Sequence, residues 1–338
     1  MYREYFDLTS NPFSMTPQPS MVYMTPGHRE ALAGLAYAVF EKKGFVVLVG
    51  EAGTGKSTLL ARTLHHMLTN RVVSSVILNP TLNESEFLEL MMLDFGFPTV
   101  PESKAQRLIM FQEFLIKTNR AGKIAVLVVD EAHKMTPAVL EEVRLLSNLE
   151  LPGEKLLQIV LAGQPELVTL LNRPDLRQLS QRISVRLRID RLTESEIEHY
   201  VTFRWTRNSF SAPPFTADSY ASIARFSHGI PRLVNAICDN ALTLAFAEKS
   251  RTVESRHIEE ACRDLWLVDR PSEADGTNAH APLNGATAGR AGMNDNSGAI
   301  HPAPVPVAGL RVLESYREPR RSFWSWVTRS RPAQERGT

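Results

Sequence analysis

A glycine-rich segment near the start of the chain has the residue types that bind phosphate. Residues 50–57 read Gly-Glu-Ala-Gly-Thr-Gly-Lys-Ser, follow the apolar residues 45–49 and precede a predicted helix at 58–68. Glycines let backbone N–H groups wrap around phosphate oxygens, and the helix N-terminus adds the positive end of its dipole. The pattern, between a strand and a helix, therefore predicts a site for the phosphates of ATP.

The residues of this loop have separate predicted roles. Lys56 is expected to reach the terminal phosphates, and the Ser57 hydroxyl is expected to ligate Mg²⁺. The alternative is a glycine-rich turn that binds nothing, which the flanking strand and helix disfavour. The residues of the loop that are predicted to bind the nucleotide are Gly50, Glu51, Ala52, Gly53, Thr54, Gly55, Lys56, Ser57 and Thr58.

Two carboxylates follow a second apolar segment, residues 124–129. Parallel sheets form their ligand crevices at the carboxyl ends of their strands. Asp130 is therefore predicted to hold Mg²⁺ for the nucleotide, directly or through water, and Glu131 to orient and deprotonate the attacking water. An apolar strand that ends in acids is often only structural, but its place after the glycine-rich loop matches a Walker B element.

Two further polar residues are predicted to report on the nucleotide. Gln164 follows the next apolar segment, 157–161, and is expected to contact the terminal phosphate or the attacking water. Its alternative is a turn residue before Pro165. Arg232 opens a helix after Gly229, where a cation is unfavourable beside the helix dipole unless it binds an anion such as phosphate. It is therefore expected to convert hydrolysis into domain motion.

One arginine is predicted to reach the ATP of a neighbouring subunit, because a guanidinium neutralises the charge that develops on the transferred phosphate. Arg182 is the preferred residue and Arg177 the second choice. The other arginines of this region fit the solvent-exposed faces of a helix and an edge strand. His133 has no second ligand at useful spacing, so it is interpreted as a structural residue beside the site. The arginines considered are Arg173, Arg177, Arg182, Arg186, Arg188 and Arg191.

Apolar segments alternate with helical segments over residues 45–191, which predicts an α/β fold with a parallel sheet wrapped by helices. Thr136 before Pro137, and Thr193 with Glu196, mark helix starts. Trp205 and the apolar pairs Met91-Met92 and Phe111/Phe114 are interpreted as core. The predicted strands are residues 45–49, 72–78, 124–129, 157–161 and 185–189; the predicted helices after residue 193 are 194–208, 216–226, 231–248 and 255–266.

The composition bounds the class of protein. The 38 basic and 37 acidic side chains nearly cancel, so bulk charge does not favour a nucleic-acid binder. Two cysteines, Cys238 and Cys262, support neither a disulfide framework nor a metal cluster, which fits a cytoplasmic location. The N-terminus lacks the layout of a secretory signal, and no apolar run approaches the roughly 20 residues that cross a bilayer.

Residues 269–338 are expected to form a disordered tail, since their few apolar residues cannot offset the entropy of ordering. Residues 317–331 combine arginines with Phe323, Trp324 and Trp326. This mixture suits an anionic membrane surface, and so a peripheral association with the inner membrane. A solvated basic tail or a peptide that binds a partner protein is the alternative.

Beyond the loop motif, the sequence resembles the ExeA/GspA-type secretion ATPases within the AAA+ proteins, which are related to the ATPases of some transposition systems. The resemblance covers residues 1–267 and implies an AAA+ P-loop core with a five-stranded parallel sheet at 45–191, a small all-helical lid at 192–268 and a flanking segment at 1–44. The segments that carry it are residues 5–8, 11–13, 28–32, 130–133, 140–150, 155–167, 176–183 and 229–232.

The resemblance implies ATP hydrolysis with Mg²⁺ between subunits of a homo-oligomer, a sensor at Arg232, and residues 11–13 over the adenine. It also implies a motor or switch that supports assembly of a bacterial envelope secretion, pilus or polysaccharide export system. Larger members continue into a transmembrane helix and a peptidoglycan-binding region, and these 338 residues are not expected to contain either. The expected partner is therefore a membrane or envelope-assembly protein.

Two other hypotheses remain open at this point. One is a regulatory ATPase of a transposition system that acts on DNA, with arginines of residues 173–191 lining the inner face of a ring. The other is a nucleotide-binding scaffold that hardly hydrolyses ATP, which the presence of Glu131 disfavours.

Overall fold

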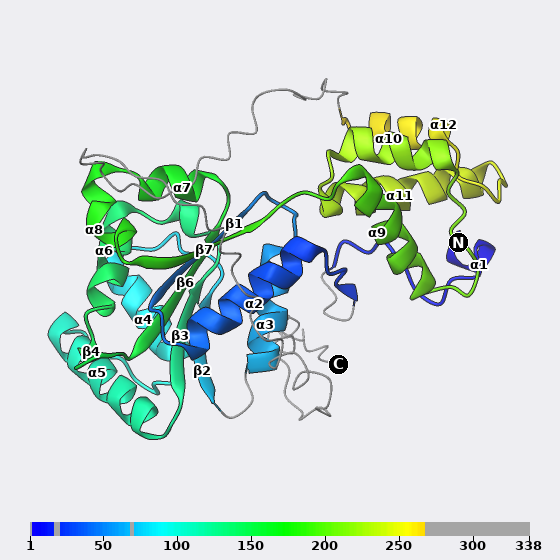
Figure 1. The fold of residues 1–338 in the computed structure, drawn as a ribbon. Coiled ribbons are helices and arrows are strands. Elements are labelled where there is room, and N and C mark those ends of the chain that lie inside the picture. The colour runs from blue at the N-terminus through cyan, green and yellow to red at the C-terminus, as the bar shows by residue number, and fades with distance from the viewer. Residues whose placement is uncertain (1, 17–20, 68–70, 268–338) are drawn as a thin grey trace, which may run out of the picture. The chain divides into compact units, whose positions relative to one another are not determined.

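The computed structural model describes residues 2–16, 21–67 and 71–267. Its centre is a parallel sheet with the strand order β2-β3-β6-β1-β7 (Figure 1). The order places β3, β6 and β1 in the interior of the sheet, where their residues are almost entirely buried. The strands are β1 (Phe45–Gly50), β2 (Val72–Ile77), β3 (Ile124–Val129), β6 (Leu157–Gly163) and β7 (Ile183–Ile189).

Helices cover both faces of the sheet because successive strand residues point to opposite sides. Val46 and Leu48 pack with α2 (Pro26–Phe40) and α3 (Lys56–Met67) in one core. Val47 faces the other core, formed with the second group of helices. That group is α4 (Glu84–Asp94), α5 (Lys104–Arg120), α6 (Pro137–Leu146) and the shorter α7 (Glu166–Leu171) and α8 (Arg177–Ser180).

The predicted AAA+ sheet and its helical wrapping are confirmed, with strand ends displaced by up to two residues. Thr136 caps α6 by accepting a hydrogen bond from the Val139 backbone N–H. Met91, Met92 and Phe111 are buried as predicted, and Phe114 stacks on Phe111.

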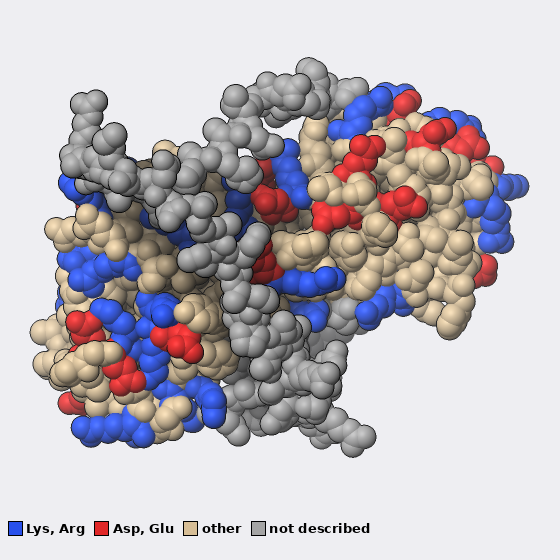
Figure 2. Space-filling model, in the orientation of Figure 1, with Lys and Arg blue, Asp and Glu red and all other residues tan. Residues whose placement is uncertain are grey.

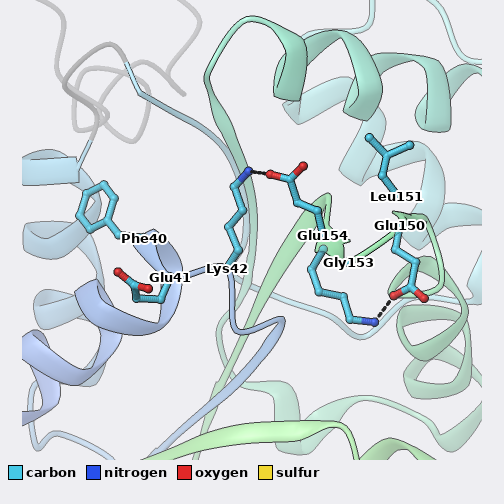
Figure 3. A pocket seen from close by; sticks show the side chains of 8 residues that line it. Phe40, Glu41, Lys42, Glu150, Leu151, Gly153 and Glu154 are labelled. Atoms are coloured by element: carbon cyan, nitrogen blue, oxygen red, sulfur yellow. Dashed lines mark hydrogen bonds and ion pairs between the residues drawn. The ribbon is translucent and has the colours of Figure 1, made fainter.

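A two-stranded hairpin, β4 (Glu150–Leu151) and β5 (Glu154–Lys155), was not predicted from the sequence, since strands of two residues carry no periodicity. With the end of α2 it lines a pocket held by the ion pairs Lys42–Glu154 and Lys155–Glu150 (Figure 3). The residues that line the pocket precede β1 and β6 in the chain. The pocket therefore lies at the amino ends of these strands, away from the glycine-rich loop.

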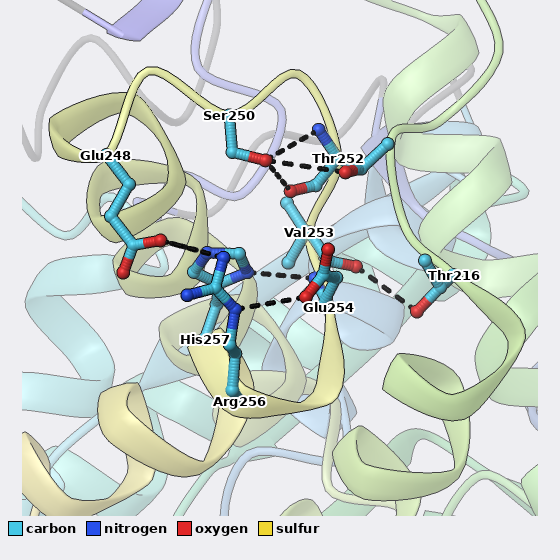
Figure 4. A network of polar contacts seen from close by, with 8 residues as sticks. All are labelled: Thr216, Glu248, Ser250, Thr252, Val253, Glu254, Arg256 and His257. Atoms are coloured by element: carbon cyan, nitrogen blue, oxygen red, sulfur yellow. Dashed lines mark hydrogen bonds and ion pairs between the residues drawn. The ribbon is translucent and has the colours of Figure 1, made fainter.

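Four helices follow β7: α9 (Glu194–Thr206), α10 (Ala217–Ser227), α11 (Pro231–Ala247) and α12 (Ser255–Asp264). Thr193 and Glu196 form the predicted capping box at the start of α9. His257 is fully buried and links α12 to the end of α11, because its Nε2 lies 3.2 Å from a Glu248 carboxylate oxygen (Figure 4). These helices correspond to the helical lid predicted from the sequence.

The N-terminal segment, which includes α1 (Tyr2–Tyr5), is part of the core of the lid. Phe6 packs against Trp205, and the ring of Phe13 is fully buried against Phe215. A fully buried ring has no free face, so Phe13 itself does not offer a stacking surface for a base in this structure. The placement of residues 11–13 over the adenine remains a prediction from the resemblance.

None of the described helices combines the length and the apolar character needed to cross a membrane. The predicted disordered tail and its basic aromatic segment at 317–331 lie outside the described residues.

Candidate functional site

The glycine-rich loop, the acidic pair and Gln164 meet at the carboxyl edge of the sheet. The glycine-rich loop follows β1, Asp130 and Glu131 follow β3, and Gln164 follows β6. Because β3, β6 and β1 are neighbours in a parallel sheet, their carboxyl ends lie side by side. The sheet thus brings together residues that are far apart in the sequence.

The loop has the backbone shape that its glycines allow. Gly53 and Gly55 have φ angles of 84° and 101°, which residues with a Cβ rarely adopt. Helix α3 begins at Lys56, so its free N–H groups and its dipole face the loop. Among the hydrogen bonds of the described residues, none uses the backbone N–H of Gly53 or Gly55 as a donor. These groups suit an anion with several oxygens.

Lys56 is buried within the loop, with 4% of its surface exposed. Its Nζ donates to the carbonyl oxygens of Gly50 and Glu51, both at 2.8 Å. Burial lowers the pKa of Lys56, and the nearby carboxylates of Asp130 and Glu131 oppose that shift. Among the described residues this buried ammonium bonds to carbonyl oxygens, so it is well placed to gain from a phosphate.

The loop and the acidic pair are joined by a direct contact. The Ser57 hydroxyl donates to a carboxylate oxygen of Asp130, and the other oxygen of Asp130 accepts the backbone N–H of Glu131 at 2.9 Å. Asp130 is 4% exposed. A hydroxyl and a carboxylate in contact at the end of a phosphate-binding loop are the hard oxygen ligands that Mg²⁺ takes. The residues present therefore fit this ion.

Glu131 has a strained backbone, with φ 54° and ψ 31°. A non-glycine residue in this left-handed region is uncommon, and such strain concentrates at functional sites. Its carboxylate lies 3.2 Å from Lys134 and 3.6 Å from His133. Although burial works to raise the pKa of Glu131, the hydrogen bond and charge of Lys134, with His133 and Gln164, lower it on balance. Glu131 is therefore held as a carboxylate.

Gln164 and His133 stand beside Glu131. The side-chain nitrogen of Gln164 lies 3.3 Å from Nε2 of His133. His133 thus links the residue predicted to deprotonate water to the residue predicted to sense phosphate. This agrees with its interpretation as a residue next to the site, while the roles of Gln164 and Glu131 remain predictions.

Arg232 is brought to the glycine-rich loop by the start of α11. Its backbone N–H donates to the Gly53 carbonyl at 3.3 Å, and a Cβ on Gly53 would lie only 2.8 Å from the Cβ of Arg232. The Arg232 side chain itself is exposed. The lid therefore contacts the loop through the residue that was predicted to sense the nucleotide.

The two arginines predicted to act on a neighbouring subunit differ in their surroundings. Arg182 is half-buried and donates to the Ser147 hydroxyl at 2.6 Å, whereas Arg177 is exposed. Arg186 and Arg188 point outward from β7, as their alternation predicted. The action of Arg182, or of Arg177 in its place, on a neighbouring subunit remains a prediction.

Two contacts of the loop were missed by the sequence interpretation. Arg191 forms a bidentate ion pair with Glu51, with N–O distances of 2.7 and 2.6 Å. His28, from α2, contacts the Thr54 carbonyl at 3.1 Å. Residue 28 lies in one of the segments that carry the family resemblance, but no local pattern shows that α2 folds back onto the loop.

The sheet order, the loop after a central strand and the acidic pair after β3 define an AAA+ P-loop fold. Residues 40–171 match the family model described as AAA domain. Over 266 residues the chain is 42% identical to General secretion pathway protein A of Aeromonas hydrophila. This similarity confirms the predicted resemblance to the ExeA/GspA-type group.

The similar region covers 78% of this chain and 48% of that protein, so the chain spans about half the length of the relative. Solved structures confirm the fold. The Pyrobaculum aerophilum Cdc6p matches with a TM-score of 0.59 and 17% identity, over 76% of this chain and 71% of that one. The Aeropyrum pernix ORC2 protein matches with a TM-score of 0.58 and 15% identity, over 76% and 72%.

Proposed function

We propose that this chain hydrolyses ATP with Mg²⁺ at the loop of residues 50–57, and that it works as a motor or switch for the assembly of a bacterial envelope secretion system. The observation that carries the proposal is the contact of Ser57 with Asp130. It joins the phosphate-binding loop to the acidic strand end, and Glu131 follows directly. The AAA domain supports the same activity.

Each residue has a defined task in this proposal. The loop N–H groups and Lys56 hold the phosphates, and Ser57 and Asp130 hold the metal ion. Bound Mg²⁺ would neutralise charge on the phosphate oxygens. Glu131, which its lowered pKa keeps ionised, accepts the proton of the attacking water.

The remaining residues would couple turnover to movement. Gln164 positions the water or the terminal phosphate, and Arg232 links the phosphate to the lid. In a homo-oligomer, Arg182, or Arg177 in its place, would stabilise the charge that develops in the neighbouring subunit's site. A cytoplasmic oligomer of this kind, peripheral to the inner membrane, would act on an envelope protein as partner.

Turnover of ATP by the purified chain tests the proposed activity. Hydrolysis should depend on Mg²⁺, stop when a chelator removes the ion, and return when Mg²⁺ is added back. Lys56→Ala should lower kcat/KM by about 10²-fold or more, because a buried cation on the phosphates is lost. Lys123→Ala, at an exposed lysine outside the site, is the matched control. Equal turnover of the two variants would refute the assignment of the loop.

The pathway rests on the similarity to General secretion pathway protein A. In its native cell, loss of this chain should reduce protein secretion, and the wild-type chain should restore it while Lys56→Ala does not. Normal secretion without the chain would remove the secretion role and leave the ATPase activity standing.

A DNA-dependent regulatory ATPase is the second candidate, favoured by the exposed Arg186 and Arg188 on the edge strand β7. On the face shown in Figure 2, however, basic and acidic side chains are interspersed. Stimulation of turnover by duplex DNA, with a steep dependence on salt, would favour this candidate over the secretion role.

A further inference from the structure

Helix α2 places a histidine side chain against the phosphate-binding loop. The buried residues of this helix include His28, Ala31 and Leu35, which share one face. Ala31 and Leu35 pack into the core beside the sheet, together with Leu59 of α3. The helix is thus fixed to the same core as the loop's own helix, so His28 has a defined position. Only 5% of the surface of His28 is exposed.

The hydrogen bonds around His28 determine which ring nitrogen carries the proton. A carbonyl oxygen only accepts, so Nε2 must donate to the Thr54 carbonyl, 3.1 Å away. Nδ1 then accepts from the Thr25 hydroxyl at 2.7 Å. That hydroxyl oxygen accepts in turn the backbone N–H of His28 at 3.1 Å. The helix cap at Thr25 therefore selects the tautomer that can bind the loop.

The carbonyl that His28 binds belongs to the peptide between Thr54 and Gly55. All peptide bonds of the described chain are trans, so the C=O and N–H of this peptide point in opposite directions. With the carbonyl directed to His28, the Gly55 N–H points away from the histidine. This N–H group has no donor role in the hydrogen bonds of the described residues.

The loop has little room to take another shape on this side. A Cβ on Gly55 would lie 3.3 Å from Nε2 of His28, and Thr54 is 1% exposed. The Thr54 hydroxyl donates to the Glu51 carbonyl at 2.8 Å, which closes the turn. On its other flank Gly53 contacts Arg232. The loop is therefore held by α2 and by α11. Of these two hydrogen bonds, the one from α2 is made by a side chain, which fixes the orientation of the peptide group that it binds.

We propose that His28 is a positioning residue, which orients the Gly55 N–H toward the phosphates by binding the Thr54 carbonyl. This inference rests on the proposed ATP site at residues 50–57. It assigns to α2 a share in nucleotide affinity, in addition to its packing on the sheet.

Substitutions at His28 in the full chain distinguish the effect of its hydrogen-bond donor from the effect of its side-chain volume. His28→Leu keeps the volume and removes the donor, and the dissociation constant for ATP with Mg²⁺ should rise about tenfold, since one buried acceptor is left unpaired and one phosphate donor is misdirected. The kcat at saturating ATP should change by less than about threefold, because the bound phosphates restore the loop. His28→Gln keeps an N–H near the position of Nε2 and should recover most of the affinity.

The cap at Thr25 gives a second test that leaves the ring in place. Thr25→Val removes the hydroxyl that sets the tautomer, and should weaken ATP binding in the same direction. Thr136→Val is the matched control, because Thr136 also caps a helix before a proline but lies at the start of α6. It should reduce thermal stability to a similar extent and leave the ATP dissociation constant unchanged.

The outcomes distinguish this inference from the proposed function. If the wild-type chain binds and hydrolyses ATP but His28→Leu binds it equally well, the positioning role is refuted. The same holds if His28→Gln is as weak as His28→Leu, or if Thr136→Val weakens binding as much as Thr25→Val. A wild-type chain without ATP binding would instead refute the proposed function.

Discussion

Glu131, the proposed base, shows how the surroundings of a single residue fix its backbone and its charge. Its backbone is strained, and its carboxylate is shared between Lys134 and His133. Left-handed strain costs on the order of 1–3 kcal/mol and persists only where neighbours enforce it. Here the Asp130 carboxylate accepts the Glu131 backbone N–H and helps to enforce it.

Replacement of this carboxylate should separate binding from turnover. Glu131→Gln keeps the shape and the hydrogen bonds but cannot take up a proton at neutral pH. We expect ATP affinity within about threefold of wild type and a kcat lower by about 10²- to 10⁴-fold. Binding of a fluorescent ATP analogue and steady-state turnover measure the two quantities. Glu113→Gln, at an exposed residue of α5, is the control, and equal turnover of both variants would remove Glu131 from its role.

His28 also makes stability depend on pH. Burial lowers its pKa below the ordinary 6.5, although the Thr54 carbonyl and Glu196 oppose the shift. The unfolded chain therefore binds the proton first as pH falls. The contribution to stability is complete above pH 6.5 and is lost as pH falls through the folded-state pKa.

The difference in the free energy of unfolding between about pH 7.5 and about pH 5 should therefore be larger for wild type than for His28→Gln. Urea unfolding at the two pH values measures it. Equal differences in the two proteins would show that folding does not lower the pKa of His28.

At the scale of elements, a backbone contact joins the segment that follows β7 to the segment that precedes α11. Gly229 has a φ of 73°, and its carbonyl accepts the Leu192 backbone N–H at 2.8 Å. A Cβ at this position would lie 2.1 Å from the Leu192 carbonyl oxygen. The close contact of these two chain segments thus requires glycine at position 229. The same contact positions Arg232, three residues later, beside the loop.

Gly229→Ala should lower the free energy of unfolding by about 3 kcal/mol or more, because left-handed strain adds to a backbone clash. Gly122→Ala is the matched control, since Gly122 has a φ of 70° but nothing near its missing Cβ. It should cost only about 1–2 kcal/mol. Chemical denaturation of both variants tests the difference, and equal losses would mean that the clash is relieved by a small shift.

At the scale of the whole described chain, the first residues complete the core of the last helices. Phe6 and Phe13 are buried among residues of α9 to α12, and Asn11 donates to Asp239 of α11 at 2.9 Å. The Arg204 guanidinium donates to the Pro12 carbonyl at 2.6 Å. The core of the lid therefore combines residues that precede the sheet domain in the chain with residues that follow it.

Phe13→Ala should destabilise the protein by about 3–5 kcal/mol, as expected for a fully buried ring. Met15→Ala, two residues away and 49% exposed, should change stability by less than about 0.5 kcal/mol. Thermal unfolding followed by circular dichroism compares them. A small effect of Phe13→Ala would mean that the segment docks loosely on the lid.

Strong periodicity and turn chemistry made much of this fold predictable. The five strands, the lid helices and the caps at Thr136 and Thr193 follow from local patterns that the tertiary structure does not override. The hairpin at β4 and β5 escaped prediction because its strands are too short to show a period. The burial of Phe13 was not predicted either, because a single aromatic residue in an irregular segment does not indicate which core it joins.

The sequence by itself determined the loop motif, the acidic pair and the alternation of strands and helices that predicts a parallel sheet, because each depends on neighbours in the chain. Only the tertiary structure decided that Ser57 contacts Asp130, that Arg232 reaches Gly53 and that His28 holds the Thr54 carbonyl. Those contacts depend on the strand order and on the packing of α2 and α11. Packing of distant elements is set by the whole core, so no local segment of the sequence encodes it.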